Sequence, residues 1–120
     1  MKVPGPDHPI TIASTPGRVR VTRDGTTIAD TTRALTLKEA SYPPVQYIPR
    51  ADANAALLIP STLVTRCPYK GDASYFSIKV GDRVIENAIW SYETPFDAVK
   101  PITGHLAFYP DKVTIEQLAG

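Results

Sequence analysis

The stretch TRCPYKGDASYFS, from Thr65 to Ser77, concentrates residue types that could do chemistry. It contains the only cysteine of the chain, Cys67, and a lysine, Lys70, directly before a glycine. A cysteine becomes a nucleophile where a cation or a helix end lowers its pKa, although a lone cysteine is more often a small buried hydrophobe. Lys70 could bind an anion as a point charge. It is not part of a Walker loop, in which glycine precedes the lysine and a helix follows.

Arg50 and His105 are further candidates for contact with a charged or reacting group. Arginine presents a planar fork of donors to a carboxylate or a phosphate, but Arg50 could equally form a structural ion pair with Glu39. Histidine can act as a general acid or base near neutral pH, and His105 could also be an ordinary hydrogen-bonded residue at the rim. We take Cys67 and His105 as the candidate catalytic residues.

Aromatic rings with a polar tip are numerous, since the chain has six tyrosines and one tryptophan against three phenylalanines. Such rings line small-ligand pockets, and they also form the rims of hydrophobic cores. We expect the candidates, which come from separated segments, to meet in one pocket at the ends of strands. The predicted ligand-binding residues are Tyr47, Arg50, Lys70, Trp90 and Tyr92. Together with His105 they predict a small anionic ligand, such as a carboxylate, a phosphate or a nucleotide, with Cys67 at the floor.

The same residues leave two other functions open. One is a thiol- or histidine-dependent enzyme that uses Cys67 or His105. The other is a non-catalytic interaction domain that forms a homodimer through an edge strand.

Composition and motifs argue against several other classes. The formal net charge is +1, from 13 basic and 12 acidic residues, so we expect neither a nucleic-acid partner nor a membrane partner. One cysteine cannot supply the cysteine pairs of a zinc cage. There is no Asp-x-Asp pair, no G-x-S-x-G motif and no Rossmann glycine fingerprint. We predict neither a metal nor a cofactor.

The apolar segments are short. The longest run, AALLI at residues 55–59, is far below the roughly 20 residues that span a bilayer. The first ten residues, MKVPGPDHPI, lack the apolar segment of a secretory signal. We therefore expect a cytoplasmic location.

The elements that would position these groups are mostly strands. RVRVTRDGTTIAD predicts a hairpin with Asp24-Gly25 in its turn, and SYFSIKVGDRVIENAIWSY predicts a second one around Gly81-Asp82. YPPVQYIPR predicts an edge strand or a structured loop. Three alternations complete the pattern: Leu35, Leu37 and Glu39; Ala88, Trp90 and Tyr92; and Leu106 with Phe108 opposite His105, Ala107 and Tyr109.

The sum is a mainly β fold, a single compact antiparallel β domain over residues 1–120 that closes as a small barrel or a curved two-sheet sandwich. One short helix is expected around residues 52–58, with Asp52 as its N-cap. Residues 1–10 are expected to form a loosely ordered arm. Glu39, at the end of an apolar row, is expected at the rim of the core or beside a cation.

The succession YPPVQYIPRAD, TRCPYKGDASYFS, AIWSYETP and ITGHLAFYPDKV resembles a family of small, mainly bacterial proteins, domain of unknown function 427, provisionally labelled nucleotidyl transferase-like. The resemblance runs from about GRVRV to DKVTI and implies a compact β-rich fold without an established activity. The family's recurrent positions correspond here to Tyr47, Pro49, Arg50, Cys67, Pro68, Lys70, Gly71, Trp90, Tyr92, Gly104, His105, Phe108 and Tyr109. Nucleotidyl transfer itself is not expected, because no carboxylate pair is placed to hold magnesium.

Overall fold

The structure, a computed structural model, describes residues 1–119. These residues form ten β-strands and three short 3₁₀ helices. In chain order they are β1 (Ile10–Ser14), β2 (Arg18–Arg23), β3 (Thr26–Thr31), β4 (Leu35–Glu39), β5 (Val45–Tyr47), η1 (Arg50–Asp52), η2 (Ala55–Leu57), β6 (Leu58–Cys67), β7 (Gly71–Val80), β8 (Arg83–Ser91), η3 (Asp97–Ile102), β9 (Ala107–Phe108) and β10 (Thr114–Leu118). None of the helices in this part of the chain has the length and apolar composition needed to span a bilayer.

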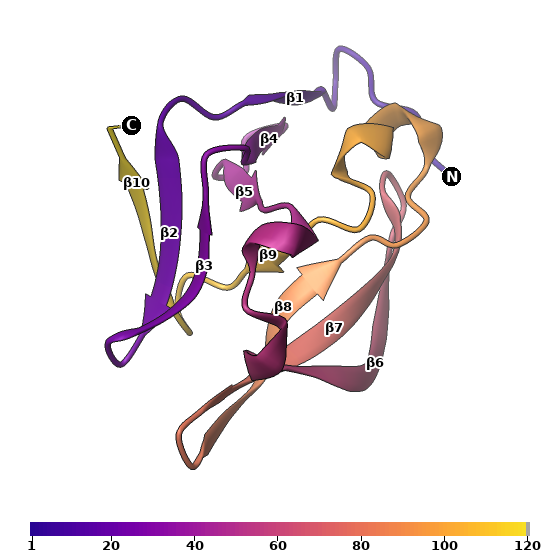
Figure 1. Cartoon of the computed structure of the whole chain (residues 1–120). Coiled ribbons are helices and arrows are strands. Elements are labelled where there is room, and N and C mark those ends of the chain that lie inside the picture. Colours follow the sequence, from indigo (N-terminus) through magenta and orange to yellow (C-terminus); the bar gives the residue numbers. More distant parts are fainter. Residues whose placement is uncertain (120) are drawn as a thin grey trace.

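The strands form three antiparallel sheets, in the orders β1-β4-β5, β10-β2-β3 and β6-β7-β8-β9. Figure 1 shows the β10-β2-β3 sheet on one side of the molecule and the β6-β7-β8 strands on the other, with β4, β5 and β9 between them. The mainly β, antiparallel fold is thus confirmed. The barrel is not: the sheets remain separate over the described residues, and a short bridge from Ile48 to Leu106 joins β5 to the chain before β9.

Both predicted hairpins are present, and their turns explain why. Asp24 and Gly25 have φ values of 51° and 79°, the left-handed conformation that a two-residue hairpin turn requires. Gly81 has the same requirement, with φ 58°, between β7 and β8. Val19 and Val21 of β2 are fully buried, so they share the inner face of the strand.

A bulge in the second hairpin redirects its side chains. Between the pairs Phe76–Ile89 and Ile78–Ile85, Ser77 alone faces residues 86–88 of β8. Asn87 takes a positive φ of 51°, and its backbone N–H donates to the Ser77 hydroxyl at 3.0 Å. This bulge moves Ala88 away from the row predicted with Trp90 and Tyr92, because it re-aims the strand at that point.

Two hydrophobic cores result, and β9 lies between them. The first contains the buried valines of β2 together with Ile48, Ile89, Leu106 and Phe108. The second contains Leu37, Tyr47, Ala73, Tyr75, Tyr92, Val99, Ile102 and Ala107. The predicted alternation before and along β9 is therefore confirmed, since Leu106 and Phe108 enter one core while Ala107 enters the other.

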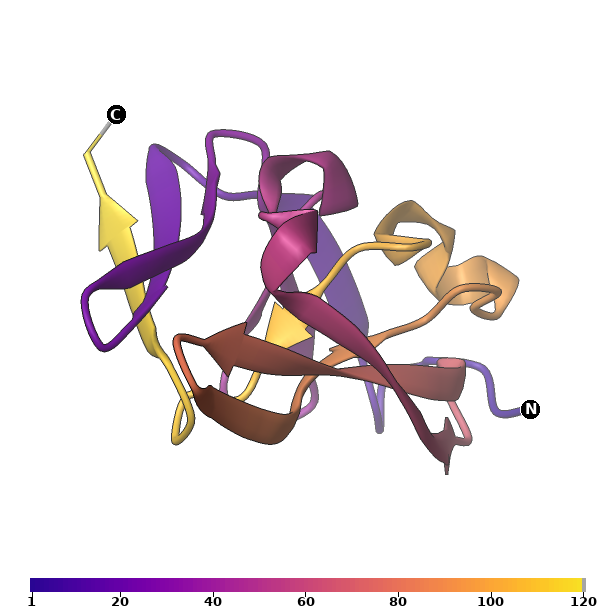
Figure 2. The same ribbon diagram turned by 60° about the horizontal axis from the view of Figure 1, so that its bottom comes forward.

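The helix expected around residues 52–58 is present only as two isolated 3₁₀ turns, η1 and η2, which lead into β6 (Figure 2). Asp52 is not an N-cap. Its carboxylate instead accepts from the Thr31 hydroxyl at 2.6 Å and from Arg33 at 3.1 Å. Asn54 caps η2 by accepting from the Ala56 N–H at 3.2 Å. The apolar residues that follow belong to β6, where they pair with β7.

Candidate functional site

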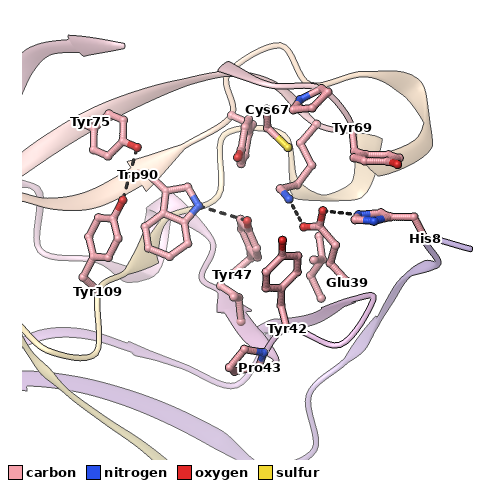
Figure 3. Close-up of a pocket in the computed structure, with 15 residues that line it drawn as sticks. His8, Glu39, Tyr42, Pro43, Tyr47, Cys67, Tyr69, Tyr75, Trp90 and Tyr109 are labelled. Carbon is pink, nitrogen blue, oxygen red and sulfur yellow. Dashed lines mark hydrogen bonds and ion pairs between the residues drawn. The ribbon is translucent and has the colours of Figure 1, made fainter. Parts of the chain in front are cut away.

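A cavity of about 450 Å³ opens beside the second core. All six tyrosines of the chain line it, whereas none of the three phenylalanines does. We call it the tyrosine pocket (Figure 3). Its lining residues are His8, Leu37, Glu39, Tyr42, Pro43, Val45, Tyr47, Cys67, Pro68, Tyr69, Lys70, Tyr75, Trp90, Tyr92 and Tyr109.

The pocket residues come from strands and turns that meet only in three dimensions. Leu37 and Glu39 follow the alternation of β4, and Tyr47 ends β5, which pairs with β4. Trp90 lies on β8 directly opposite Tyr75 of β7. Of the residues predicted to meet in one pocket, this cavity brings together Tyr47, Cys67, Lys70, Trp90 and Tyr92.

The turn between β6 and β7 is held in place by Gly71. Its φ of 109° favours glycine, and a Cβ there would contact the Thr94 carbonyl oxygen at 3.6 Å. The Phe96 N–H also donates to the Lys70 carbonyl at 3.0 Å. This hydrogen bond fixes the backbone from which the Lys70 side chain enters the pocket.

Lys70 and Glu39 form a buried ion pair in the tyrosine pocket. Their side chains are only 10% and 14% exposed. His8 Nε2 donates to the second Glu39 oxygen at 2.8 Å, and its ring stacks on Tyr69 with centroids 3.8 Å apart. The cation expected beside Glu39 is therefore Lys70, and Arg50 does not pair with Glu39.

The electrostatic balance keeps Glu39 charged. Burial by itself would raise the pKa of this carboxyl group, but hydrogen bonds from Lys70 and His8 outweigh burial and hold the pKa below its usual value. The carboxylate is thus already occupied by two donors from the protein.

The tyrosine hydroxyls are arranged in two groups. On one side Tyr75 contacts the Thr65 hydroxyl at 2.9 Å and the Tyr109 hydroxyl at 3.4 Å. On the other side Tyr47 accepts a hydrogen bond from Trp90 Nε1 at 3.3 Å. Within residues 1–119 the hydroxyl of Tyr92 makes no hydrogen bond to the protein, and its oxygen reaches the pocket surface although Tyr92 as a whole is only 6% exposed.

These hydroxyls keep their protons. Burial raises the pKa of Tyr47 and of Tyr92 well above the usual tyrosine value, even though the Trp90 hydrogen bond opposes the shift at Tyr47. Burial and the contact with Tyr75 raise the pKa of Tyr109 to about 12. Near neutral pH the pocket therefore offers phenol O–H donors rather than phenolates.

Cys67 is a half-buried free cysteine at the end of β6, and it lines the tyrosine pocket. In Figure 3 its sulfur faces the same space as the Tyr47 hydroxyl and the Glu39 carboxylate. A catalytic role of the thiol stays a hypothesis.

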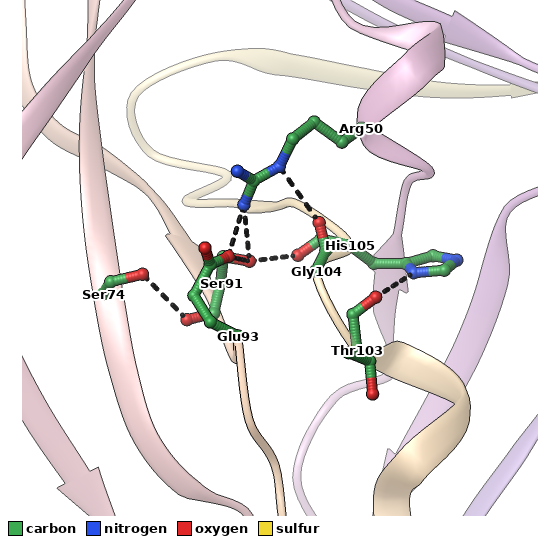
Figure 4. A network of polar contacts seen from close by, with 7 residues as sticks. All are labelled: Arg50, Ser74, Ser91, Glu93, Thr103, Gly104 and His105. Carbon is green, nitrogen blue, oxygen red and sulfur yellow. Dashed lines mark hydrogen bonds and ion pairs between the residues drawn. The ribbon is translucent and has the colours of Figure 1, made fainter.

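Arg50 and His105 lie outside the tyrosine pocket, in a second hollow lined by residues 49–51, 103–105, Arg33 and Glu93. Arg50 pairs with Glu93 and donates to the Gly104 carbonyl and the Ser91 hydroxyl, both at 3.3 Å (Figure 4). We call this group, with Ser91 and His105, the arginine site.

His105 belongs to the arginine site through its backbone. Its carbonyl accepts from the Ser91 hydroxyl at 2.8 Å, while its ring Nδ1 donates to the Thr103 carbonyl at 3.1 Å. The single pocket predicted for Arg50, Lys70 and His105 is therefore divided. The backbone bridge between Ile48 and Leu106 explains the division. Arg50 lies two residues after Ile48 and His105 directly before Leu106, so this bridge brings the two residues together beyond the end of β5.

Several pocket residues had only weak signals in the sequence. The sequence places Glu39 at the rim of the core or beside a cation, because it follows Leu35 and Leu37 in one row, but it does not mark Glu39 as a ligand-binding residue. His8 gave no signal, because it lies in a proline-rich segment without periodicity. Within residues 1–119 no group of three His, Cys, Asp or Glu side chains is placed to hold a metal ion.

Comparison with known families gives one match. Residues 11–118 match the family described as a domain of unknown function, DUF427. A comparison with curated proteins finds no match. Since the matched region covers most of the sequence, the chain belongs to the DUF427 family.

Proposed function

We propose that this DUF427 chain is a small-molecule-binding domain, and that its ligand presents an anionic group to Lys70 in the tyrosine pocket. The observation that carries the proposal is the segregation of rings: every tyrosine of the chain lines one cavity, and every phenylalanine lies elsewhere. Packing of a hydrophobic core does not require hydroxyl groups, whereas a ligand site uses them to hydrogen-bond and orient the ligand.

The size and lining of the pocket fit a small ligand. Its volume of about 450 Å³ falls in the range of known small-molecule sites. Leu37, Pro43 and Val45 add apolar surface beside the rings. A few polar groups among apolar walls are typical of sites that bind and orient one molecule.

The charges support an anionic group on the ligand. An ammonium group has three N–H donors, and among the described residues only Glu39 accepts from Lys70. His8 contacts the same carboxylate from the other side. A ligand carboxylate or phosphate could therefore bind Lys70 without displacing Glu39.

A thiol–imidazole enzyme built on Cys67 and His105 has less support. Cys67 lines the tyrosine pocket, while His105 lies in the arginine site with its ring turned to the Thr103 carbonyl. We do not propose this pair as a catalytic unit.

A thermal-shift screen with carboxylate- and phosphate-bearing metabolites tests the proposal. We expect at least one compound to raise the melting temperature of the wild-type protein. Cys67→Phe, which places a ring in the cavity, should abolish this shift, whereas Cys67→Ser, which keeps the space, should retain it. His105→Ala is the matched control in the arginine site and should respond like wild type.

The proposal fails if folded Cys67→Phe responds to the same compounds as wild type. It also fails if the screen gives no stabilising compound and the pocket resonances of the wild-type protein do not shift at millimolar concentrations of the same panel.

A further inference from the structure

The hydroxyls of Tyr92 and Tyr47 are hydrogen-bond donors in the pocket, and they indicate which acceptor group the ligand presents in addition to its charge. Tyr92 is 6% exposed and Tyr47 1% exposed, and both line the tyrosine pocket. No fully buried side-chain N or O atom among the described residues lacks a hydrogen-bond partner, so a hydroxyl there without a protein partner reaches the open surface of the pocket, where a ligand acceptor can bind it. Among residues 1–119, Tyr92 has no such partner, so its O–H is free to donate to a ligand.

Tyr47 is also a free donor. Its oxygen accepts the Trp90 indole N–H at 3.3 Å, and this contact leaves its own proton without an assigned acceptor in the described chain. A hydroxyl that already accepts one hydrogen bond is a better donor, because hydrogen bonds in a chain polarise one another. The two phenols thus form a pair of donors at one pocket.

A cationic ligand is disfavoured, although aromatic pockets often bind cations. Lys70 Nζ lies 5.9 Å from the centroid of the Tyr92 ring, so the protein already places its own cation at this ring. Glu39, the acid in the pocket lining, already accepts from Lys70 and His8. A ligand cation would meet a like charge and no available carboxylate.

The rings favour a planar ligand. Trp90 and Tyr109 lie with centroids 4.6 Å apart at 48°, and Tyr47 meets the Trp90 ring edge-on at 6.4 Å. All three rings line the pocket, and a fused ring system can pack against them by offset stacking or edge-to-face contact.

We infer that the ligand is a planar molecule that ends in an oxygen acceptor, a carboxylate or a conjugated carbonyl, held by the hydroxyls of Tyr92 and Tyr47. This inference rests on the proposed function of the tyrosine pocket and specifies the chemical class that the pocket accepts. It excludes planar cations of the same shape.

Three isosteric probes test the inference: 2-naphthoate, 2-naphthamide and 2-naphthamidine. Trp90 is the only tryptophan, so the single indole N–H cross-peak in a ¹H–¹⁵N spectrum reports binding at the pocket directly. We expect the cross-peak to shift with 2-naphthoate, to shift at higher concentration with 2-naphthamide, and to stay in place with 2-naphthamidine.

Hydroxyl deletions identify the donors. Tyr92→Phe keeps the ring and removes only the hydroxyl group. It should weaken 2-naphthoate binding about tenfold, which is the effect expected when one hydrogen bond to a charged group is lost. Tyr47→Phe should weaken it by a similar factor. Thr103→Val removes a hydroxyl outside the tyrosine pocket and should leave the affinity unchanged.

The outcomes separate the two proposals. If 2-naphthamidine binds as well as 2-naphthoate, or if both phenylalanine variants bind 2-naphthoate like wild type, the inferred ligand class is overturned while the binding function stands. If none of the three probes shifts the indole cross-peak at millimolar concentration, the inferred ligand class is overturned, and the proposed function falls with it only if the carboxylate and phosphate panel also leaves the pocket resonances unshifted.

Discussion

The tyrosine pocket and the arginine site both gather polar side chains from distant segments, but they differ in what those groups still offer. In the arginine site, Arg50 is shared among Glu93, Ser91 and the Gly104 carbonyl. In the tyrosine pocket, Lys70 has one protein partner among the described residues and Tyr92 has none.

The ion pairs of the two regions also differ in solvent exposure. The ion pair of the arginine site is 44% and 50% exposed, whereas that of the tyrosine pocket is 10% and 14% exposed. The exposed Arg50–Glu93 pair, whose guanidinium is also bound to Ser91 and the Gly104 carbonyl, fits a structural role, whereas the buried Lys70–Glu39 pair beside free donors fits a binding site. The lesson is that a predicted arginine or histidine becomes a site candidate only if its hydrogen bonds leave donors or acceptors free.

The largest expected difference between the two regions is in their contribution to stability at alkaline pH. The folded-state pKa values of Tyr47, Tyr92 and Tyr109 are raised, so their stabilisation is complete below the unfolded tyrosine pKa near 10 and is lost as pH rises above it. Between its unfolded-state pKa and its raised folded-state pKa, each of these three tyrosines should lower the free energy of unfolding by up to about 1.4 kcal/mol per pH unit. Urea unfolding between pH 9 and 12 measures this slope.

Tyr47→Phe should make the alkaline slope shallower, because one perturbed hydroxyl is removed. His105→Ala, in the arginine site, should leave the slope unchanged. Phenolate absorbance from every tyrosine at pH 10, with the fold intact, would show that the pocket hydroxyls are not protected.

Matched substitutions of the two cations should differ in stability. Lys70→Met leaves the Glu39 carboxylate buried with only His8 as a partner, and it should cost about 3 kcal/mol. Arg50→Met breaks an exposed pair and should cost about 1 kcal/mol. Chemical denaturation of both variants tests the difference.

The double variant Lys70→Met/Glu39→Leu should recover most of the loss, because the unpaired carboxylate is gone. Equal costs for the two single substitutions would remove the distinction between a buried and an exposed pair.

Acid should affect the tyrosine pocket by a smaller amount. Since the folded-state pKa of Glu39 is lowered, its stabilisation is present above the usual glutamate pKa and is lost as pH falls through the lowered value. Thermal melts from pH 6 to pH 3 should therefore show a decline that Glu39→Gln makes shallower. An unchanged decline in Glu39→Gln would assign the acid sensitivity to other carboxylates.

The smallest effect is expected for His105→Ala. The ring makes one hydrogen bond, to the Thr103 carbonyl, and the contacts of its backbone persist in alanine. We expect a change in unfolding free energy below about 0.5 kcal/mol and unchanged ligand binding. Loss of ligand-induced stabilisation in this variant would return His105 to the candidate site.

Local patterns predicted much of the fold. Asp24-Gly25 and Gly81-Asp82 located both hairpins, because a two-residue turn has narrow backbone requirements. The alternation from Leu106 to Tyr109 assigned each side chain to one of the two cores. The excess of tyrosine over phenylalanine indicated a ligand pocket or a core rim, and the parity of Glu39 indicated a place at the core rim or beside a cation.

Features that depend on long-range pairing could not be predicted. The bulge at Ser77 arises from its pairing with β8, and no local motif marks it. The helix expected around Asp52 reduces to two turns because the following apolar residues pair with β7. Arg50 is separated from Lys70 by the Ile48–Leu106 bridge, which joins segments far apart in the sequence.

The most direct test of the central claim is a residue-by-residue map of backbone and indole chemical shifts during a titration with 2-naphthoate. We expect the largest shifts at the Trp90 indole, Cys67 and Tyr92, whereas Arg50, Gly104 and His105 stay unperturbed. Shifts centred on the arginine site, with the Trp90 indole unmoved, would contradict the claim.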